Sequence, residues 1–301
     1  MSSESFNLND IYDLTGRIAL VTGGGTGIGL MIAQGFATNG AKVYITGRRR
    51  EVLDKVASEW KGAGSLVPLA MDVTDKESIM NARKEVEAKD GKLHILVNNS
   101  GQTGPRSGFM NDPNAPERKD ADTFGLALFN NESMEGWKDL YAVNTFSIFF
   151  TTSAFLGLLD KGSKDRTRYT SCVINITSIS GVTKLAQNHA HLQFCYNSSK
   201  AAASHMTKMM ATEYALKGID VRVNSIAPGV YASEMTFLEI EGEAQTNKVG
   251  QPLVSIPIKR SGTAQEMAGT AIYLASPAGC YTNGQEIIVD GGYLAVNPST
   301  A

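Results

Sequence analysis

Cysteine is scarce in this chain, and its few copies are not arranged in pairs. The 301 residues contain three cysteines, Cys172, Cys195 and Cys280, which lie scattered along the sequence. This spacing fits neither a structural zinc site nor a framework of disulfide bonds. We therefore expect no metal centre, and we expect a protein that works in a reducing compartment, the cytoplasm.

An excess of charge of one sign is also lacking, and so are export and membrane signals. The chain has 28 Lys and Arg against 30 Asp and Glu, so no large positive field is expected to attract nucleic acid. The first sixteen residues carry Glu4, Asp10 and Asp13 and no basic region followed by an apolar run, so no secretory signal is expected. The longest nearly apolar segment, 146–159, ends at Asp160, short of the roughly 20 residues that cross a bilayer. We expect a buried helix there and no membrane partner.

The chain shows no internal repeat, and 42% of its residues are hydrophobic, which is enough for one substantial core. Seven short apolar runs alternate with segments of helical periodicity. The runs are 17–22, 41–46, 65–71, 93–97, 172–177, 219–227 and 286–290. Strands separated by helices favour a parallel sheet with right-handed crossovers. We predict a single doubly wound α/β domain over 1–301, with a seven-stranded parallel sheet flanked by helices and an N-terminal extension at 1–14.

Glycines gather directly after the first apolar run. Gly23, Gly27 and Gly29 lie in the cluster, and helical periodicity resumes over 30–38. Such glycines let the backbone turn sharply, while the new helix directs its N–H groups and positive dipole end at an anion. This arrangement suits the pyrophosphate of a dinucleotide in a Rossmann fold, although the spacing differs from Gly-x-Gly-x-x-Gly. The alternative is a tight turn without a ligand.

Basic residues follow the second run. In dinucleotide-binding folds the end of the second strand faces the adenosine ribose, where an acid accepts the 2′-hydroxyl and an Arg holds a 2′-phosphate. Here the strand ends at Gly47, and Arg48, Arg49 and Arg50 follow it. Arg48 therefore favours NADP(H) over NAD(H). For Arg49 and Arg50 an exposed basic turn is an equally good interpretation.

A phenol and an ammonium are held together near the middle of the chain. Tyr196 precedes Lys200 by four residues, which places both side chains on one helix face, one turn apart. Ser178 closes the fifth apolar run and can present its hydroxyl from a strand end toward the same point. The combination indicates acid–base chemistry on an oxygen atom. The alternative is an ordinary amphipathic-helix spacing.

Two stretches lack clear periodicity. The segment 102–132 is rich in Gly, Pro, Asn and charge, and we predict a long inserted loop beside the site. The segment 233–255 is mostly polar, and we predict a substrate lid in which Glu234, Met235 and Phe237 line either the lid or a simple turn. Between 137 and 159 we expect one long helix. His189 and His191 fall in a polar loop and are interpreted as solvated side chains.

Taken in order, these residues resemble the short-chain dehydrogenase/reductase family over about Leu14 to Leu294. The resemblance is carried by Thr22-Gly-x-x-x-Gly-Ile-Gly29, Asn98-Asn99-Ser100-Gly101, Asn144, Ser178, Tyr196-x-x-x-Lys200, Pro228-Gly229 and Asp290-Gly291-Gly292. Each motif is weak singly, and their order along the chain is what makes the series specific.

The resemblance implies site residues. Tyr196 would be the general acid, Lys200 would bind the nicotinamide ribose, Ser178 would hydrogen-bond the substrate oxygen, and Asn144 would organise a water relay behind Lys200. The implied cofactor-binding residues are Gly23, Thr26, Gly27, Ile28 and Gly29 at the pyrophosphate loop, Arg48, Asp72 and Val73 at the adenosine, and Asn98, Gly101, Tyr196, Lys200, Pro228, Gly229 and Ser233 along the remaining cofactor. Because a free phenol has a pKa near 10, we expect Lys200 and an oxidised nicotinamide to lower the pKa of Tyr196.

The implied activity is NADPH-dependent reduction of a ketone, with β-ketoacyl and polyketide-type ketones as candidates, in a homotetramer or homodimer. An NAD-dependent secondary alcohol dehydrogenase is the alternative within the family, and a non-catalytic NADP(H)-sensing protein is the alternative from another class. Three features depart from the family. The segment 187–192 and the segment 102–132 are longer than usual, and Thr26 stands where many NADP-dependent members have a basic residue.

Overall fold

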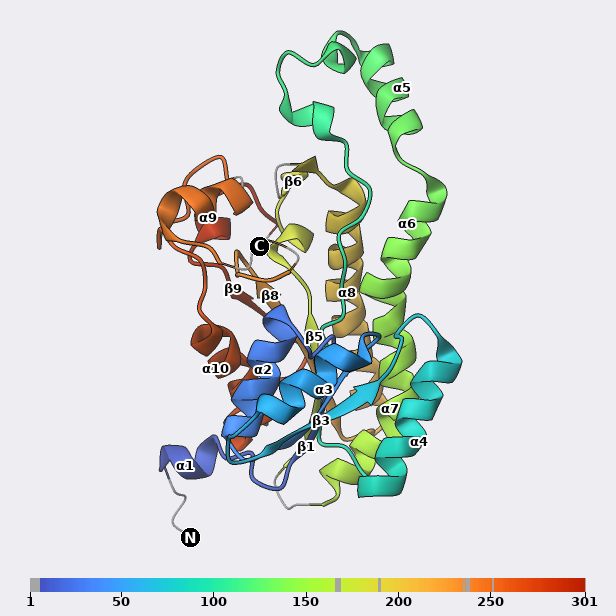
Figure 1. Cartoon of the computed structure of the whole chain (residues 1–301), viewed down its shortest axis with the longest axis vertical. Helices are drawn as coiled ribbons and strands as arrows, with labels where there is room; N and C mark the ends of the chain where they lie inside the picture. Colours follow the sequence, from blue (N-terminus) through green and yellow to red (C-terminus); the bar gives the residue numbers. More distant parts are fainter. Residues whose placement is uncertain are drawn as a thin grey trace.

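The computed structural model describes residues 6–165, 169–188, 191–234, 236, 239–250 and 252–300. Its centre is a seven-stranded sheet in the order β3-β2-β1-β4-β5-β8-β9, and every pairing in this sheet is parallel (Figure 1). The strands are β1 (Ile18–Thr22), β2 (Lys42–Gly47), β3 (Ser65–Ala70), β4 (Ile95–Asn98), β5 (Ser171–Ile176), β8 (Val221–Pro228) and β9 (Glu286–Val289). The predicted doubly wound parallel sheet is confirmed.

Helices cover both faces of the sheet, which explains why the central strands are buried throughout. One face packs on α2 (Gly27–Thr38), α3 (Arg50–Glu59) and α10 (Ala264–Ala275). The other packs on α4 (Lys76–Asp90), α7 (Ser147–Ser163) and α8 (Phe194–Leu216). Alternate residues of β1 enter the two cores, with Ala19 and Val21 on one side and Ile18 and Leu20 on the other. This period-2 alternation is the geometry that a strand imposes.

Several further elements are short. They are α1 (Leu8–Ile11), the 3₁₀ turns η1 (Gly108–Asn111), η2 (Pro116–Arg118), η4 (Ile179–Gly181) and η5 (Pro277–Gly279), the hairpin of β6 (Gln187–Asn188) and β7 (His191–Leu192), and the helices α9 (Gly242–Gly250) and α11 (Tyr293–Val296). The described part of the N-terminal extension includes α1, and the region predicted as a lid contains α9.

The long helix predicted over 137–159 extends further, from Met134 to Ser163, as α6 (Met134–Tyr141), a π-helical segment η3 (Ala142–Phe146) and α7. By length and composition alone this helix is long and apolar enough to cross a membrane, with a mean hydropathy of 1.5 over its most apolar window. Half of that window is buried inside the protein, and α7 packs on α4, β4 and β5. We therefore interpret it as a core helix of the α/β fold.

The prediction of a plain loop over 102–132 was wrong in its secondary structure. The segment contains η1, η2 and the helix α5 (Ala121–Asn131), which begins where the Asp120 carboxylate accepts a hydrogen bond from the Thr123 N–H at 2.8 Å. An N-cap and a run of Leu and Ala overcame the polar composition. Figure 1 shows α5 standing away from the sheet, and none of its residues is buried. The segment therefore forms an arm, of which η1 contacts β7.

Candidate active site

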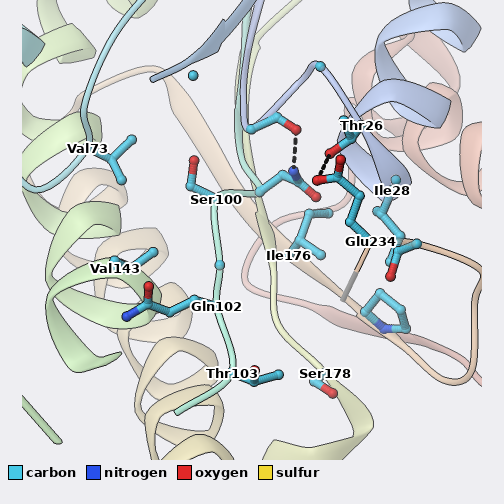
Figure 2. Close-up of a pocket in the computed structure, with 18 of the residues that line it drawn as sticks. Thr26, Ile28, Val73, Ser100, Gln102, Thr103, Val143, Ile176, Ser178 and Glu234 are labelled. Atoms are coloured by element: carbon cyan, nitrogen blue, oxygen red, sulfur yellow. Dashed lines mark hydrogen bonds between the residues drawn. The ribbon is translucent and has the colours of Figure 1, made fainter. Parts of the chain in front are cut away.

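A cavity of about 660 Å³ opens at the carboxyl ends of the strands (Figure 2). It lies beside β1. The chain adds β2 and β3 on one side of this strand and then crosses over to add β4 and β5 on the other side. Ligands of open α/β sheets bind at such a switch point. The volume falls within the range of small-molecule and cofactor sites.

The glycine cluster forms one wall of the cavity, and its backbone excludes side chains. Gly23 and Gly27 have φ of 61° and 52°, in the left-handed region that favours glycine. A Cβ at Gly29 would lie 2.3 Å from the Gly23 carbonyl oxygen, and one at Gly27 would lie 3.0 Å from the Ser233 Cβ. Thr26 is the N-cap of α2, but its hydroxyl makes no capping hydrogen bond. This wall therefore fits the pyrophosphate of a dinucleotide, which needs close approach to the main chain.

A hydrogen-bond network that the sequence did not predict fixes this loop against β4. The Thr22 hydroxyl oxygen accepts the N–H groups of Asn99 and Ser100, both at 2.9 Å. The Asn99 amide donates in turn to the carbonyl oxygens of Thr22 at 2.9 Å and Gly23 at 3.2 Å. The network joins the ends of β1 and β4 beside the cavity.

The predicted acid–base residues meet at the inner end of the cavity. Ser178, Tyr196 and Lys200 all line it, and their exposed fractions are 8%, 6% and 4%. The Lys200 Nζ donates to the Ile176 carbonyl oxygen at 2.9 Å and lies 5.9 Å from the centre of the Tyr196 ring. The Ser178 hydroxyl oxygen accepts the Ser180 N–H at 3.1 Å. Ser178 reaches the cavity from the turn after β5, and Tyr196 and Lys200 reach it from α8.

Burial dominates the titration behaviour of these groups in the protein alone. Burial raises the pKa of Tyr196 to about 12, and the hydrogen bond with Ser178 only partly opposes this effect. Burial also lowers the pKa of Lys200 to about 8, because an ammonium loses hydration in the protein interior. The protein groups by themselves therefore do not lower the pKa of Tyr196, and its lowering by Lys200 together with an oxidised nicotinamide stays a prediction.

Asn144 lies next to the cavity and not in its wall. It sits in the π-helical segment η3, a kind of distortion often found at functional sites. Its Oδ1 accepts the Gln102 N–H at 2.9 Å, and its Nδ2 donates to the Gln102 carbonyl oxygen and to the Ser199 hydroxyl, each at 3.1 Å. Asn144 thus fastens the chain that leaves β4 to α8. The predicted water relay behind Lys200 stays a prediction.

The outer part of the cavity is charged. Arg48 and Arg49 line it at the end of β2, and Asp72 and Val73 line it after β3. Burial opposes ionisation of Asp72, but hydrogen bonds from Thr74 and the charge of Arg48 together hold its pKa below its usual range. The charge of Arg48 therefore reaches Asp72 across the outer part of the cavity, and contact of these residues with an adenosine stays a prediction.

Most of the predicted site residues come together in this cavity. Those that line it are Gly23, Thr26, Gly27, Ile28, Arg48, Asp72, Val73, Gly101, Ser178, Tyr196, Lys200, Pro228, Gly229 and Ser233. Gly29, Asn98 and Asn144 do not. The Asn98 amide lies in the core, where it donates to Thr152 at 2.9 Å and Asn175 at 2.8 Å, so its part in the site differs from the prediction. His189, Met235 and Phe237 lie outside the described residues.

Several lining residues had no clear signal in the sequence. Gln102 and Thr103 enter from the start of the arm, and Tyr231 follows β8. Arg49 and Glu234, for which the sequence left a simple turn as the alternative, meet at the mouth of the cavity. Asn99 belongs to the Asn98-Asn99-Ser100-Gly101 motif, but the sequence did not indicate that its side chain bonds to the carbonyl oxygens of Thr22 and Gly23. Among the described residues, no cluster of three His, Cys, Asp or Glu side chains is arranged to hold a metal ion.

Comparisons with known proteins agree with this geometry. Residues 23–294 match a family model described as enoyl-(acyl carrier protein) reductase. The chain is 36% identical over 294 residues to short-chain dehydrogenase/reductase PhomF of Diaporthe leptostromiformis, covering 97% of this chain and 96% of the relative. It is 32% identical over 286 residues to the rhamnolipids biosynthesis 3-oxoacyl-(acyl-carrier-protein) reductase of Pseudomonas aeruginosa, covering 95% and 99%. The solved Pseudomonas aeruginosa RhlG/NADP active-site complex is similar with a TM-score of 0.75 at 30% identity, covering 94% and 98% of the two chains.

Proposed function

This chain belongs to the short-chain dehydrogenase/reductase family, and we propose that within this family it is an NADPH-dependent reductase that converts a ketone to a secondary alcohol. One observation carries the proposal. Ser178, Tyr196 and Lys200 gather at the inner end of a cavity whose outer part presents Arg48 and a glycine-lined helix N-terminus. The cavity thus combines a candidate proton donor with groups that suit a dinucleotide.

The reduced nicotinamide, when bound, supplies the hydride that reduces the carbonyl carbon. The chain supplies the proton, which passes from the Tyr196 hydroxyl to the carbonyl oxygen and completes the alcohol. The Ser178 hydroxyl, which shares a hydrogen bond with Tyr196 in this structure, would turn its O–H to the substrate oxygen when a ketone is bound between the two side chains. Lys200, whose Nζ donates to the Ile176 carbonyl oxygen, would use its remaining N–H groups to hold the nicotinamide ribose.

Cofactor choice rests on the outer part of the cavity. An Arg, and no acid, follows the end of β2, so the residue there suits a 2′-phosphate better than a free 2′-hydroxyl. The similar RhlG structure is a complex with NADP. An NAD-dependent secondary alcohol dehydrogenase is the alternative. Steady-state kinetics with NADPH and NADH separate the two, because comparable kcat/KM for both cofactors would remove the role given to Arg48.

For the substrate, we propose a ketone of the β-ketoacyl or polyketide type. The support is the 32% identity to a 3-oxoacyl-(acyl-carrier-protein) reductase over nearly the whole chain. A screen of carbonyl compounds that follows NADPH absorbance tests this. Turnover of 3-oxoacyl thioesters is the expected result, and turnover confined to sugars or simple alcohols would overturn the substrate class.

A protein that senses NADP(H) without turnover is the alternative from another class. It would need no proton donor in the cavity, whereas this chain retains Ser178, Tyr196 and Lys200 there together. NADP(H) binding without oxidation in the presence of every ketone tested would favour the sensor.

We also propose a cytoplasmic homotetramer or homodimer. All three cysteines are free, which fits a reducing compartment. On α7 and the turn before it, Phe146, Phe149 and Phe150 expose 48%, 50% and 39% of their surface, an apolar face of the kind that subunits cover. Light scattering on the purified protein tests the assembly, and a monomer at micromolar concentration would contradict it.

A further inference from the structure

The mouth of the cavity is crossed by an ion pair. The Glu234 carboxylate accepts a hydrogen bond from Arg49 Nη2 at 2.7 Å. It accepts another from the Thr26 hydroxyl at 3.2 Å, which Figure 2 shows. All three residues line the cavity, although Glu234 and Arg49 are 185 positions apart in the sequence. One carboxylate therefore joins the start of α2, the end of β2 and the segment after β8.

The position of Glu234 is set by a closed turn. The Thr236 N–H donates to the Ser233 carbonyl oxygen at 3.1 Å, and the Thr236 hydroxyl donates to the Tyr231 carbonyl oxygen at 2.8 Å. Ser233 is itself packed close to Gly27, where a Cβ would lie 3.0 Å from the Ser233 Cβ. The backbone of Glu234 is thus held beside the glycine loop, within reach of Arg49.

The partners of this carboxylate are groups that a phosphorylated cofactor needs. Arg49 adjoins Arg48 on the adenosine side, and a guanidinium is the preferred partner of a phosphate. Hydrogen bonding to Arg49 holds the pKa of Glu234 below its usual range, so the carboxylate is charged at neutral pH. The Glu234 carboxylate therefore pairs with the Arg49 guanidinium, next to the position expected for the 2′-phosphate.

We propose that Glu234 determines cofactor specificity by competing with the 2′-phosphate of NADP(H) for Arg49. This inference rests on the proposed function, because it requires a dinucleotide in the cavity. When the 2′-phosphate takes Arg49, the bond between Arg49 and Glu234 is given up, so affinity for NADP(H) is lowered while NAD(H), which has no 2′-phosphate, leaves the pair intact. Arg48 and Arg49 together form the phosphate site, and Glu234 restrains it.

Isothermal titration calorimetry with NADP⁺ and NAD⁺ tests the competition without any need for turnover. Because exposed ion pairs contribute only modestly, Glu234→Gln should tighten NADP⁺ binding about two- to fivefold and leave NAD⁺ binding unchanged. In an Arg49→Ala background, Glu234→Gln should have no further effect on NADP⁺. Asp54→Asn is the matched control, because Asp54 pairs with the neighbouring Arg50 at 2.8 Å and neither residue lines the cavity. It should leave both affinities unchanged.

The possible failures are distinguishable. Wild-type protein that binds neither nucleotide would overturn the proposed function and the inference with it. If the wild type binds NADP⁺, the inference alone is overturned by unchanged or weaker NADP⁺ binding in Glu234→Gln. Equal tightening of NAD⁺, or tightening that persists without Arg49, would also overturn it, because the carboxylate would then act through its general negative charge.

Discussion

The two ends of the cavity work by different physics. At the inner end, Ser178, Tyr196 and Lys200 are almost completely buried, and desolvation moves the pKa of both Tyr196 and Lys200. At the outer rim, formed by Arg48, Arg49 and Glu234, the side chains of Arg49 and Glu234 are 57% and 47% exposed. Water and salt screen charges there. Substitutions at the inner end should therefore have large effects, and those at the rim should adjust affinity.

The largest effect is expected for Tyr196→Phe. It removes the proton donor but keeps the ring, so ketone reduction should fall about 10²- to 10⁴-fold while NADP⁺ binding persists. Stopped-flow or steady-state rates and calorimetry measure the two properties. Tyr214→Phe, on the same helix but outside the cavity lining, is the control. An unchanged rate of ketone reduction in Tyr196→Phe would exclude Tyr196 as the general acid. Substitutions at the inner end would then not have the larger effects expected there.

The substitution Asn98→Ala distinguishes a structural role of the buried Asn98 side chain from a role in binding the cofactor. The change removes two buried hydrogen bonds and leaves Thr152 and Asn175 without that donor, so the free energy of unfolding should fall by about 1 to 3 kcal/mol. Urea denaturation measures this loss. KM for NADPH should stay the same, because Asn98 does not line the cavity. A raised KM at unchanged stability would show instead that Asn98 binds the cofactor.

The buried ammonium should also appear in the pH dependence of stability. The pKa of Lys200 falls from 10.5 in the unfolded chain to about 8, so between these values the unfolded state binds more protons and stability rises with pH. Relative to Lys200→Met, the wild type should therefore gain about 2 kcal/mol in the free energy of unfolding between pH 8 and pH 10. Comparison with this variant removes the contributions of other groups.

Lys208→Met, an exposed position on the same helix, is the control for that experiment and should behave like the wild type. Parallel stability curves for the wild type and Lys200→Met over this pH range would mean that Lys200 keeps its hydration. The inner end of the cavity would then not differ from the outer rim in desolvation.

The smallest effect is expected at the rim. Arg48→Ala should raise KM for NADPH about tenfold and leave KM for NADH nearly unchanged, because a charge-assisted hydrogen bond to the 2′-phosphate is lost at an exposed site. Arg50→Ala is the matched control, since Arg50 pairs with Asp54 and does not line the cavity. An equal rise for both cofactors would assign Arg48 to general attraction of anions.

Local sequence patterns were sufficient to predict the strands of the sheet and several of the residues that line the cavity. Each strand is an apolar run of its own, and the helix α4 begins after Asp75, whose carboxylate accepts the Glu77 N–H. The glycine loop and the pair of Tyr196 and Lys200 depend on spacings shorter than ten residues. The arm was harder to predict, because its helix depends on a single cap at Asp120 within a polar segment.

The amino-acid sequence by itself determined the order of strands and helices and the residues that meet at the carboxyl edge of the sheet, because these follow from periodicity and from the direction of parallel strands. Tertiary structure alone decided that Asn98 points into the core while Asn99 locks the glycine loop, that Glu234 reaches Arg49, and that burial raises the pKa of Tyr196. Each of these depends on which distant groups surround a side chain and how much water they exclude. That information arises only when the chain is folded.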